Sequence, residues 1–133
     1  MTKPDPGYRK RTGDKGEEEA VQYLERKGFR ILERKWRYGQ GEIDIIARDG
    51  TVLVFVEVKT KKAEGFGEPE DWISRRKQNQ IGRLAAGYLQ VRGIENEECR
   101  FDVVTVDLTS GRPSVNHIED SFWIDSKASW RLF

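Results

Sequence analysis

The sequence has very few residues of the types that most metal sites and covalent mechanisms require. Its 133 residues include one cysteine, Cys99, and one histidine, His117. A closed zinc site needs more such ligands, and a Cys or His nucleophile needs partners that this chain does not supply. A disulfide within the chain is excluded for the same reason. Any chemistry is therefore expected to depend on carboxylates and lysines.

Other absences narrow the function classes further. No run approaches the roughly 18 apolar residues of a membrane span, and the polar first residues lack the apolar core of a signal peptide. We therefore expect a cytoplasmic protein with no membrane partner. Lys and Arg number 24 against 23 Asp and Glu, a net charge of +1, so any basic surface for nucleic acid must be local.

Length and the periodicity of apolar residues predict one α/β domain with a mixed β-sheet flanked by helices. Residues 1–11, rich in Lys, Arg and Pro, are expected to form a flexible basic arm, and residues 12–133 the single domain. The elements are expected in the order α-β-β-β-α-β-β. In residue numbers these are helix 14–27, strand 29–36, hairpin 41–61, helix 75–92 after the N-cap Ser74, and strands 99–108 and 114–118.

The most informative segment is GEIDIIARDGTVLVFVEVKTK, residues 41–61. Its apolar residues predict a β-hairpin that is at least half buried. Asp49-Gly50 is a strong signal for a two-residue turn, which would pair Arg48 with Thr51. A three-residue bulged loop would break this register.

In the predicted register, charged residues gather at the far end of the hairpin. Glu42 faces Glu57, Asp44 lies diagonal to Glu57, and period-two alternation puts these acids on one face with Lys59. Like charges directly across a ladder are destabilising unless a cation or a raised pKa relieves them. The pattern indicates a shared divalent ion, and the alternative is an exposed ion pair at a strand end.

The motifs of this segment resemble those of a known nuclease superfamily. Asp44 at the end of one strand, followed by E-x-K at Glu57 and Lys59, is similar to the PD-(D/E)xK signature, with Ile43 where the signature has proline. The set GEEEAVQYL, GEIDIIARDG, VFVEVKTK, FGEPED and CRFDVV resembles the YraN-like family of small bacterial proteins, over about residues 13–117. The resemblance implies a restriction-endonuclease-like fold, similar to that of Holliday-junction resolvases.

The resemblance also implies a role for each motif residue. Asp44 and Glu57 would hold Mg²⁺ or Mn²⁺, with the main-chain carbonyl of Val58 as a further ligand. Lys59 would orient or deprotonate the attacking water, or stabilise charge on the phosphate. The implied function is metal-dependent hydrolysis of phosphodiester bonds in DNA, including branched or damaged DNA. The alternative is a nucleic-acid-binding or partner-binding accessory protein with little or no turnover on the same fold.

Two further acids are candidates for this site. Glu17 lies on the buried stripe of the first helix, and resolvase-like proteins place a helix Glu at their metal site. Asp14 and Glu17 also have the spacing of a capping box, which would be a purely structural role. Glu42 is expected just outside the metal ligands, or as a ligand if two ions bind.

Residues around the hairpin end are candidates for contacts with phosphates. They follow the first strand, the E-x-K motif or the start of the second helix, and comprise Arg37, Lys61, Lys62, Arg75, Arg76, Lys77 and Gln78. Charge runs are also common on solvated surfaces, so both interpretations stay open. The aromatic residues of segment 121–133 are a candidate contact for a homodimer.

Overall fold

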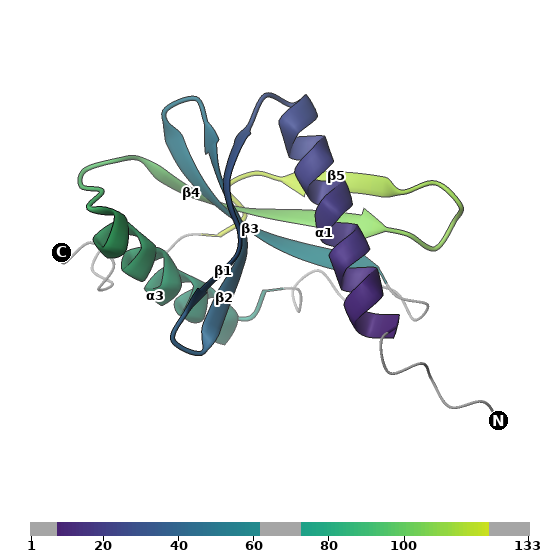
Figure 1. The fold of residues 1–133 in the computed structure, drawn as a ribbon, viewed down its shortest axis with the longest axis horizontal. Coiled ribbons are helices and arrows are strands. Elements are labelled where there is room, and N and C mark those ends of the chain that lie inside the picture. The colour runs from purple at the N-terminus through teal and green to yellow at the C-terminus, as the bar shows by residue number, and fades with distance from the viewer. Residues whose placement is uncertain (1–7, 62–72, 123–133) are drawn as a thin grey trace.

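The computed structural model describes residues 8–61 and 73–122, with side chains described from residue 13 onward. The elements are α1 (Tyr8–Arg26), β1 (Arg30–Tyr38), β2 (Gly41–Asp49), β3 (Val52–Lys61), α3 (Arg75–Arg92), β4 (Cys99–Asp107) and β5 (Ser114–Ile118) (Figure 1). This order confirms the prediction of α-β-β-β-α-β-β. Neither described helix is long and apolar enough to cross a membrane.

The five strands form one mixed sheet in the order β1-β2-β3-β4-β5. β3 and β4 are parallel and are connected through α3, whereas the other neighbouring strands are antiparallel. A parallel pair needs such a crossover, which places a helix on one face of the sheet. The architecture is that of a restriction-endonuclease-like fold, as expected.

The two helices cover opposite faces of the sheet. α1 packs on a cluster that includes Ile45, Val54 and Val104. α3 packs on a second cluster that includes Phe55 and Phe101. Because both faces are covered, the central strands β3 and β4 consist largely of buried apolar residues, and charged side chains within them need partners.

The ends of α3 agree with the sequence signals. Ser74 is its N-cap, and the Ser74 side-chain oxygen accepts a 3.1 Å hydrogen bond from the Lys77 N–H. Gly93 follows the helix with a φ of 65°, in the left-handed conformation that glycine adopts most readily.

The predicted start of the first helix is wrong. α1 begins at Tyr8 rather than Asp14, so residues 8–11, which were expected within the basic arm, belong to the helix. The added segment has no apolar stripe, but its Lys and Arg residues are good helix formers and extend a helix that the later stripe anchors. Residues 1–7 of the predicted arm lie outside the described residues.

The predicted register of the hairpin is also wrong. Asp49 pairs with Val52 and Arg48 with Leu53, so the two turn residues are Gly50 and Thr51. Gly50 has a φ of 61°, whereas the φ of Asp49 is not positive. Glycine at the first turn position is typical of a type II′ turn, whereas a two-residue turn at Asp49-Gly50 would be of type I′ and require a positive φ at both positions.

Candidate functional site

The structure brings Asp44 of β2 and Glu57 of β3 into contact. The register ends at Ile45 and Val56, and one residue further on, Asp44 is the neighbour of Glu57 instead of Phe55; the two carboxyl groups share a hydrogen bond. Asp44 Oδ2 also accepts a 2.8 Å hydrogen bond from the Val58 N–H. Glu57 is only 8% exposed. Two carboxylates in such a contact repel each other, so the ion-free pair retains a proton up to about pH 7.

The surroundings indicate which carboxyl group carries that proton. Burial, followed by the charge of Asp44, raises the pKa of Glu57 from 4.5 to about 7, against the effect of Lys77 and Lys59. Burial also raises the pKa of Asp44, but the hydrogen bond from Val58 favours its charged form. The hydrogen bond from the Val58 N–H therefore favours the arrangement in which Glu57 is the donor and Asp44 the charged acceptor.

Two lysines from different elements lie beside Glu57. The Nζ atoms of Lys59 on β3 and Lys77 on α3 are each 3.8 Å from Glu57 Oε1. These distances are too long for hydrogen bonds, so both ammonium groups keep donors for another anion. The Ser74 cap fixes the main chain of Lys77, and Lys59 follows Glu57 on the same face of β3.

A cavity of about 230 Å³ opens on the α1 side of Asp44. Its lining consists of Gly13, Asp14, Glu17, Lys35, Glu42, Asp44, Val58 and Thr60. Glu17 is 6% exposed, and within the described residues its Oε1 has no hydrogen-bond partner. Burial and then the charge of Asp44 raise the pKa of Glu17 to about 7. A buried carboxylate oxygen without a donor is costly, which makes this cavity a place for a water molecule that donates to Glu17.

A glycine allows α1 to carry Glu17 this close to the sheet. A Cβ atom at Gly16 would lie 2.0 Å from Thr60 Oγ1. Any larger residue would therefore push α1 away from β3. The close approach sets the position of Glu17 above the cavity.

The acids do not all lie on one face, which corrects the prediction. Glu57 contacts Lys77 of α3, whereas Glu42 lines the cavity with Glu17 on the α1 side. Asp44 reaches both, because it lines the cavity and contacts Glu57. The regular pairing of β2 with β3 ends at Ile45 and Val56. Beyond this pair, the side chains of the two strands need not alternate strictly between the two faces of the sheet.

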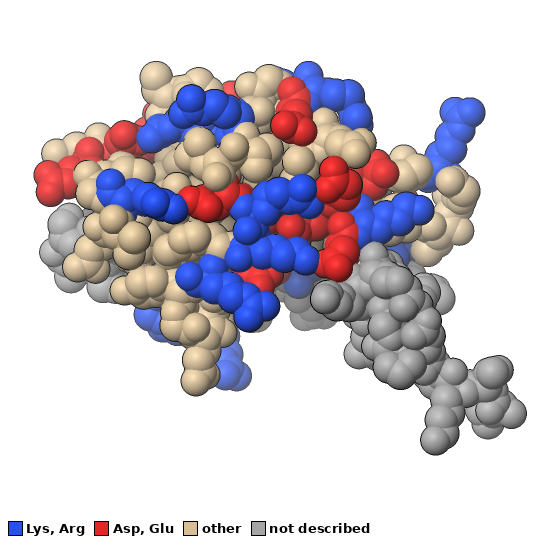
Figure 2. Space-filling model, viewed as in Figure 1, with Lys and Arg blue, Asp and Glu red and all other residues tan. Residues whose placement is uncertain are grey.

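Basic residues of β1 form ion pairs with the acids on the α1 side. Arg34 Nε lies 3.7 Å from Glu17 Oε1, and Arg37 Nε lies 3.3 Å from Glu42 Oε2. Lys35 forms an ion pair with Asp14. Figure 2 shows this alternation of basic and acidic side chains between α1 and the β1–β2 hairpin.

Sequence reasoning missed Lys35 as part of the site. Lys35 has a φ of 50°, which is unusual for a lysine within a strand and costs on the order of 1 kcal/mol. No residue type in the segment signals this backbone conformation. Only its place in the basic run before the hairpin could have suggested a role.

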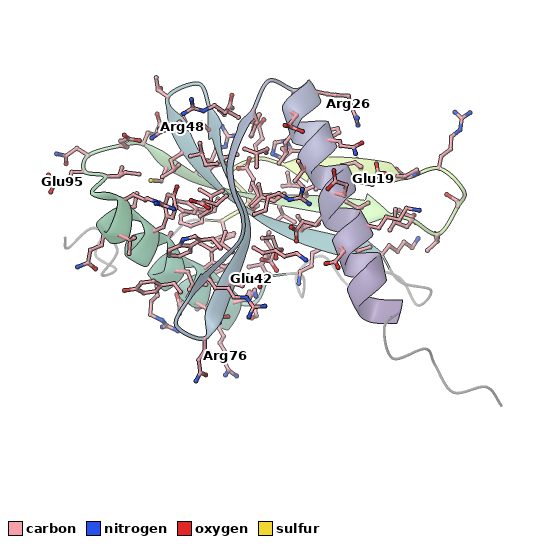
Figure 3. All side chains as sticks on the ribbon, viewed as in Figure 1. Glu19, Arg26, Glu42, Arg48, Arg76 and Glu95 are labelled. Carbon is pink, nitrogen blue, oxygen red and sulfur yellow. The ribbon has the colours of Figure 1, made fainter. Side chains whose placement is uncertain are left out.

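The predicted nucleic-acid contacts are distributed over several elements. Arg37 has a side chain that is 81% exposed, and Figure 3 shows Arg76 toward the same end of the β1–β2 hairpin as Glu42. Arg75 is likewise exposed at the start of α3. The structure does not bring Lys61 or Gln78 to the paired acids: Lys61 lies 3.5 Å from Asp107, and the Gln78 amide donates to the Ile73 carbonyl. Lys62 lies outside the described residues.

The oxygen donors present fit a hard divalent ion, with part of its coordination left open. Among the described residues, no three His, Cys, Asp or Glu side chains form a ready metal-binding group. Mg²⁺ commonly uses one or two carboxylates and completes its shell with water and substrate oxygens. Asp44 and Glu57 provide such a pair, since an ion could replace the proton that they share.

Fold and site together define a restriction-endonuclease-like α/β protein with a carboxylate pair and two lysines at the end of its hairpin. The chain belongs to a family described as "Uncharacterised protein family UPF0102", whose model matches residues 16–106. This range includes Glu17, Asp44, Glu57 and Lys59.

Relatives with the same family name match most of the chain. A UPF0102 protein of Symbiobacterium thermophilum is 44% identical over 114 residues, which cover 85% of this chain and 97% of the relative. One from Syntrophus aciditrophicus is 44% identical over 84% of this chain and 88% of the relative. One from Moorella thermoacetica is 47% identical over 74% of this chain and 82% of the relative.

Proposed function

We propose that this protein is a divalent-metal-dependent nuclease that hydrolyses phosphodiester bonds in DNA. The observation that supports this function best is the contact of Asp44 with Glu57, with Lys59 and Lys77 beside it. A purely structural role explains the arrangement poorly, because two buried carboxyl groups in contact reduce stability at neutral pH. An ion-binding role gives both groups a partner.

Each residue of the site would have its own role in such a reaction. Asp44 and Glu57 would hold Mg²⁺ or Mn²⁺, with the Val58 carbonyl as a candidate main-chain ligand. When bound, the ion would supply positive charge beside the phosphate and lower the pKa of the attacking water. Lys59 and Lys77 add charge on the side of Glu57, where they can stabilise phosphate oxygens. Because Glu57 must lose its proton to act as a ligand, binding of an ion would release a proton.

The exposed basic residues nearest this site would hold the DNA backbone. Arg75 and Arg76 begin α3 next to Lys77, and Arg37 lies at the end of β1. Contacts of this kind fix the substrate without reading its sequence and weaken as salt increases. The choice of DNA, a preference for branched or damaged substrates and a cytoplasmic location stay predictions.

A cleavage assay tests the proposal. Linear, single-stranded and four-way-junction DNA would be incubated with Mg²⁺ or Mn²⁺ and with wild type, Asp44→Asn or Glu95→Gln, the last changing an exposed acid in the loop before β4. We expect cleavage of at least one substrate by wild type and Glu95→Gln, and a loss of at least 100-fold in Asp44→Asn. Equal activity of all three proteins, or none in wild type, would contradict the proposal and favour a binding module without turnover.

A further inference from the structure

The acids on the two sides of Asp44 differ in how their charge is balanced. On the α1 side, each of the other acids of the cavity has a basic partner from β1, in the pairs Asp14–Lys35, Glu17–Arg34 and Glu42–Arg37. On the α3 side, Lys59 and Lys77 flank Glu57. Asp44 forms hydrogen bonds with Glu57 and with the Val58 N–H. The described residues include no ion pair between Asp44 and a Lys or Arg.

Lys35 is the basic residue that lines the cavity on the α1 side of Asp44. Arg34 pairs with Ile45 and Trp36 with Ile43 across β1 and β2, so Lys35 lies opposite Asp44. Its side chain lines the same cavity as Glu17 and Asp44. The positive φ of 50° therefore occurs at a residue that lines a cavity rich in acids.

A cavity that already contains an ammonium group is a poor site for a second divalent ion. Two nearby cations repel, and the Lys35 ammonium group, which pairs with Asp14 on a side chain that is 42% exposed, adds such a repulsion at the edge of the cavity. The acids of the α1 side are occupied by arginines and lysine, which lowers the negative charge available to another ion. Asp44, by contrast, is in contact with another carboxyl group, that of Glu57, and with the Val58 N–H.

From this arrangement we infer that Lys35 takes the place of a second metal ion, so that the protein binds one divalent ion, at Asp44 and Glu57. The inference rests on the proposed function, because it concerns the ion of that same site. Lys35 acts as a positioning residue: it balances the charge of the α1-side acids and prevents them from capturing an ion of their own.

The test measures how many ions bind, without using activity. Isothermal titration of Mn²⁺ at pH 8 would be performed on the full chain as wild type, Lys35→Arg and Lys35→Gly. Lys35→Arg keeps the charge, and Lys35→Gly removes it while relieving the positive φ, so the second variant is not expected to impair folding. Arg112→Gly removes one positive charge from the turn between β4 and β5 and controls for net charge.

The expected result is one ion for wild type, Lys35→Arg and Arg112→Gly, and two for Lys35→Gly. Two ions in wild type, or one in Lys35→Gly, would overturn the role of Lys35 while leaving the nuclease proposal in place. No binding by any of the four proteins would overturn the metal site itself and this inference with it. The stoichiometry therefore separates the two failures.

Discussion

Replacing Glu57 with glutamine should make the ion-free protein more stable at alkaline pH. The pKa of Glu57 is raised from 4.5 to about 7, chiefly by burial. At about 1.4 kcal/mol per pH unit, this shift corresponds to roughly 3 kcal/mol. Glutamine keeps the shape and can donate a hydrogen bond to Asp44, but it cannot become charged.

The direction follows from proton binding in the two states. Below pH 4.5 Glu57 is protonated in both the folded and unfolded states. Between 4.5 and about 7 the unfolded chain releases the proton that the folded protein retains, so the free energy of unfolding decreases as pH rises. Above about 7 the loss is complete. Relative to wild type, Glu57→Gln should therefore gain up to roughly 3 kcal/mol between acid and alkaline pH.

The assay is urea unfolding followed by tryptophan fluorescence, in the presence of EDTA, at intervals from pH 4.5 to 8.5. Glu95→Gln serves as the control, because this acid is exposed in the loop before β4 (Figure 3). The reasoning is refuted if the difference in unfolding free energy between Glu57→Gln and wild type is the same at all pH values. It is also refuted if the variant loses stability relative to wild type as pH rises.

Two further substitutions test the packing that supports the site. Gly16→Ala should cost about 1–3 kcal/mol, because its Cβ would lie 2.0 Å from Thr60 Oγ1, and adding Thr60→Ala should recover most of the loss in thermal unfolding. A double variant no more stable than Gly16→Ala would contradict that contact. Asp102→Asn should cost about 3–5 kcal/mol in urea unfolding, because the fully buried carboxylate accepts hydrogen bonds from Arg100 and His117. Burial acts to raise the pKa of Asp102 but these bonds lower it, so the deficit should shrink as pH falls below 3.8; a deficit unchanged down to the acid limit would contradict this.

Much of the fold could be predicted because its signals are local. Ser74 and Gly93 mark the ends of α3, and apolar runs bounded by turn residues define the strands. The turn at Gly50 was misassigned because Asp-Gly fits a type I′ turn and Gly-Thr a type II′ turn, and the sequence supports both. The start of α1 was missed because helical residues without an apolar stripe carry no periodic signal.

The site could be predicted only where the strand pattern constrains it. The observed register differs from the predicted one by two residues, and this even shift still brings Asp44 near Glu57. The catalytic roles of the two residues stay predictions. Lys35 could not be found, because its place depends on a positive φ and on the register of β1 with β2. The ion pairs between β1 and α1 are long-range contacts that no spacing in the sequence encodes.

The most direct test of the central claim is whether a divalent ion replaces the proton shared by Asp44 and Glu57. Mn²⁺ would be titrated into wild type and Asp44→Asn at pH 6.5, in two buffers with different enthalpies of ionisation. We predict binding with release of a proton in wild type, and no binding in Asp44→Asn. Binding without proton release, or equal binding by Asp44→Asn, would contradict it.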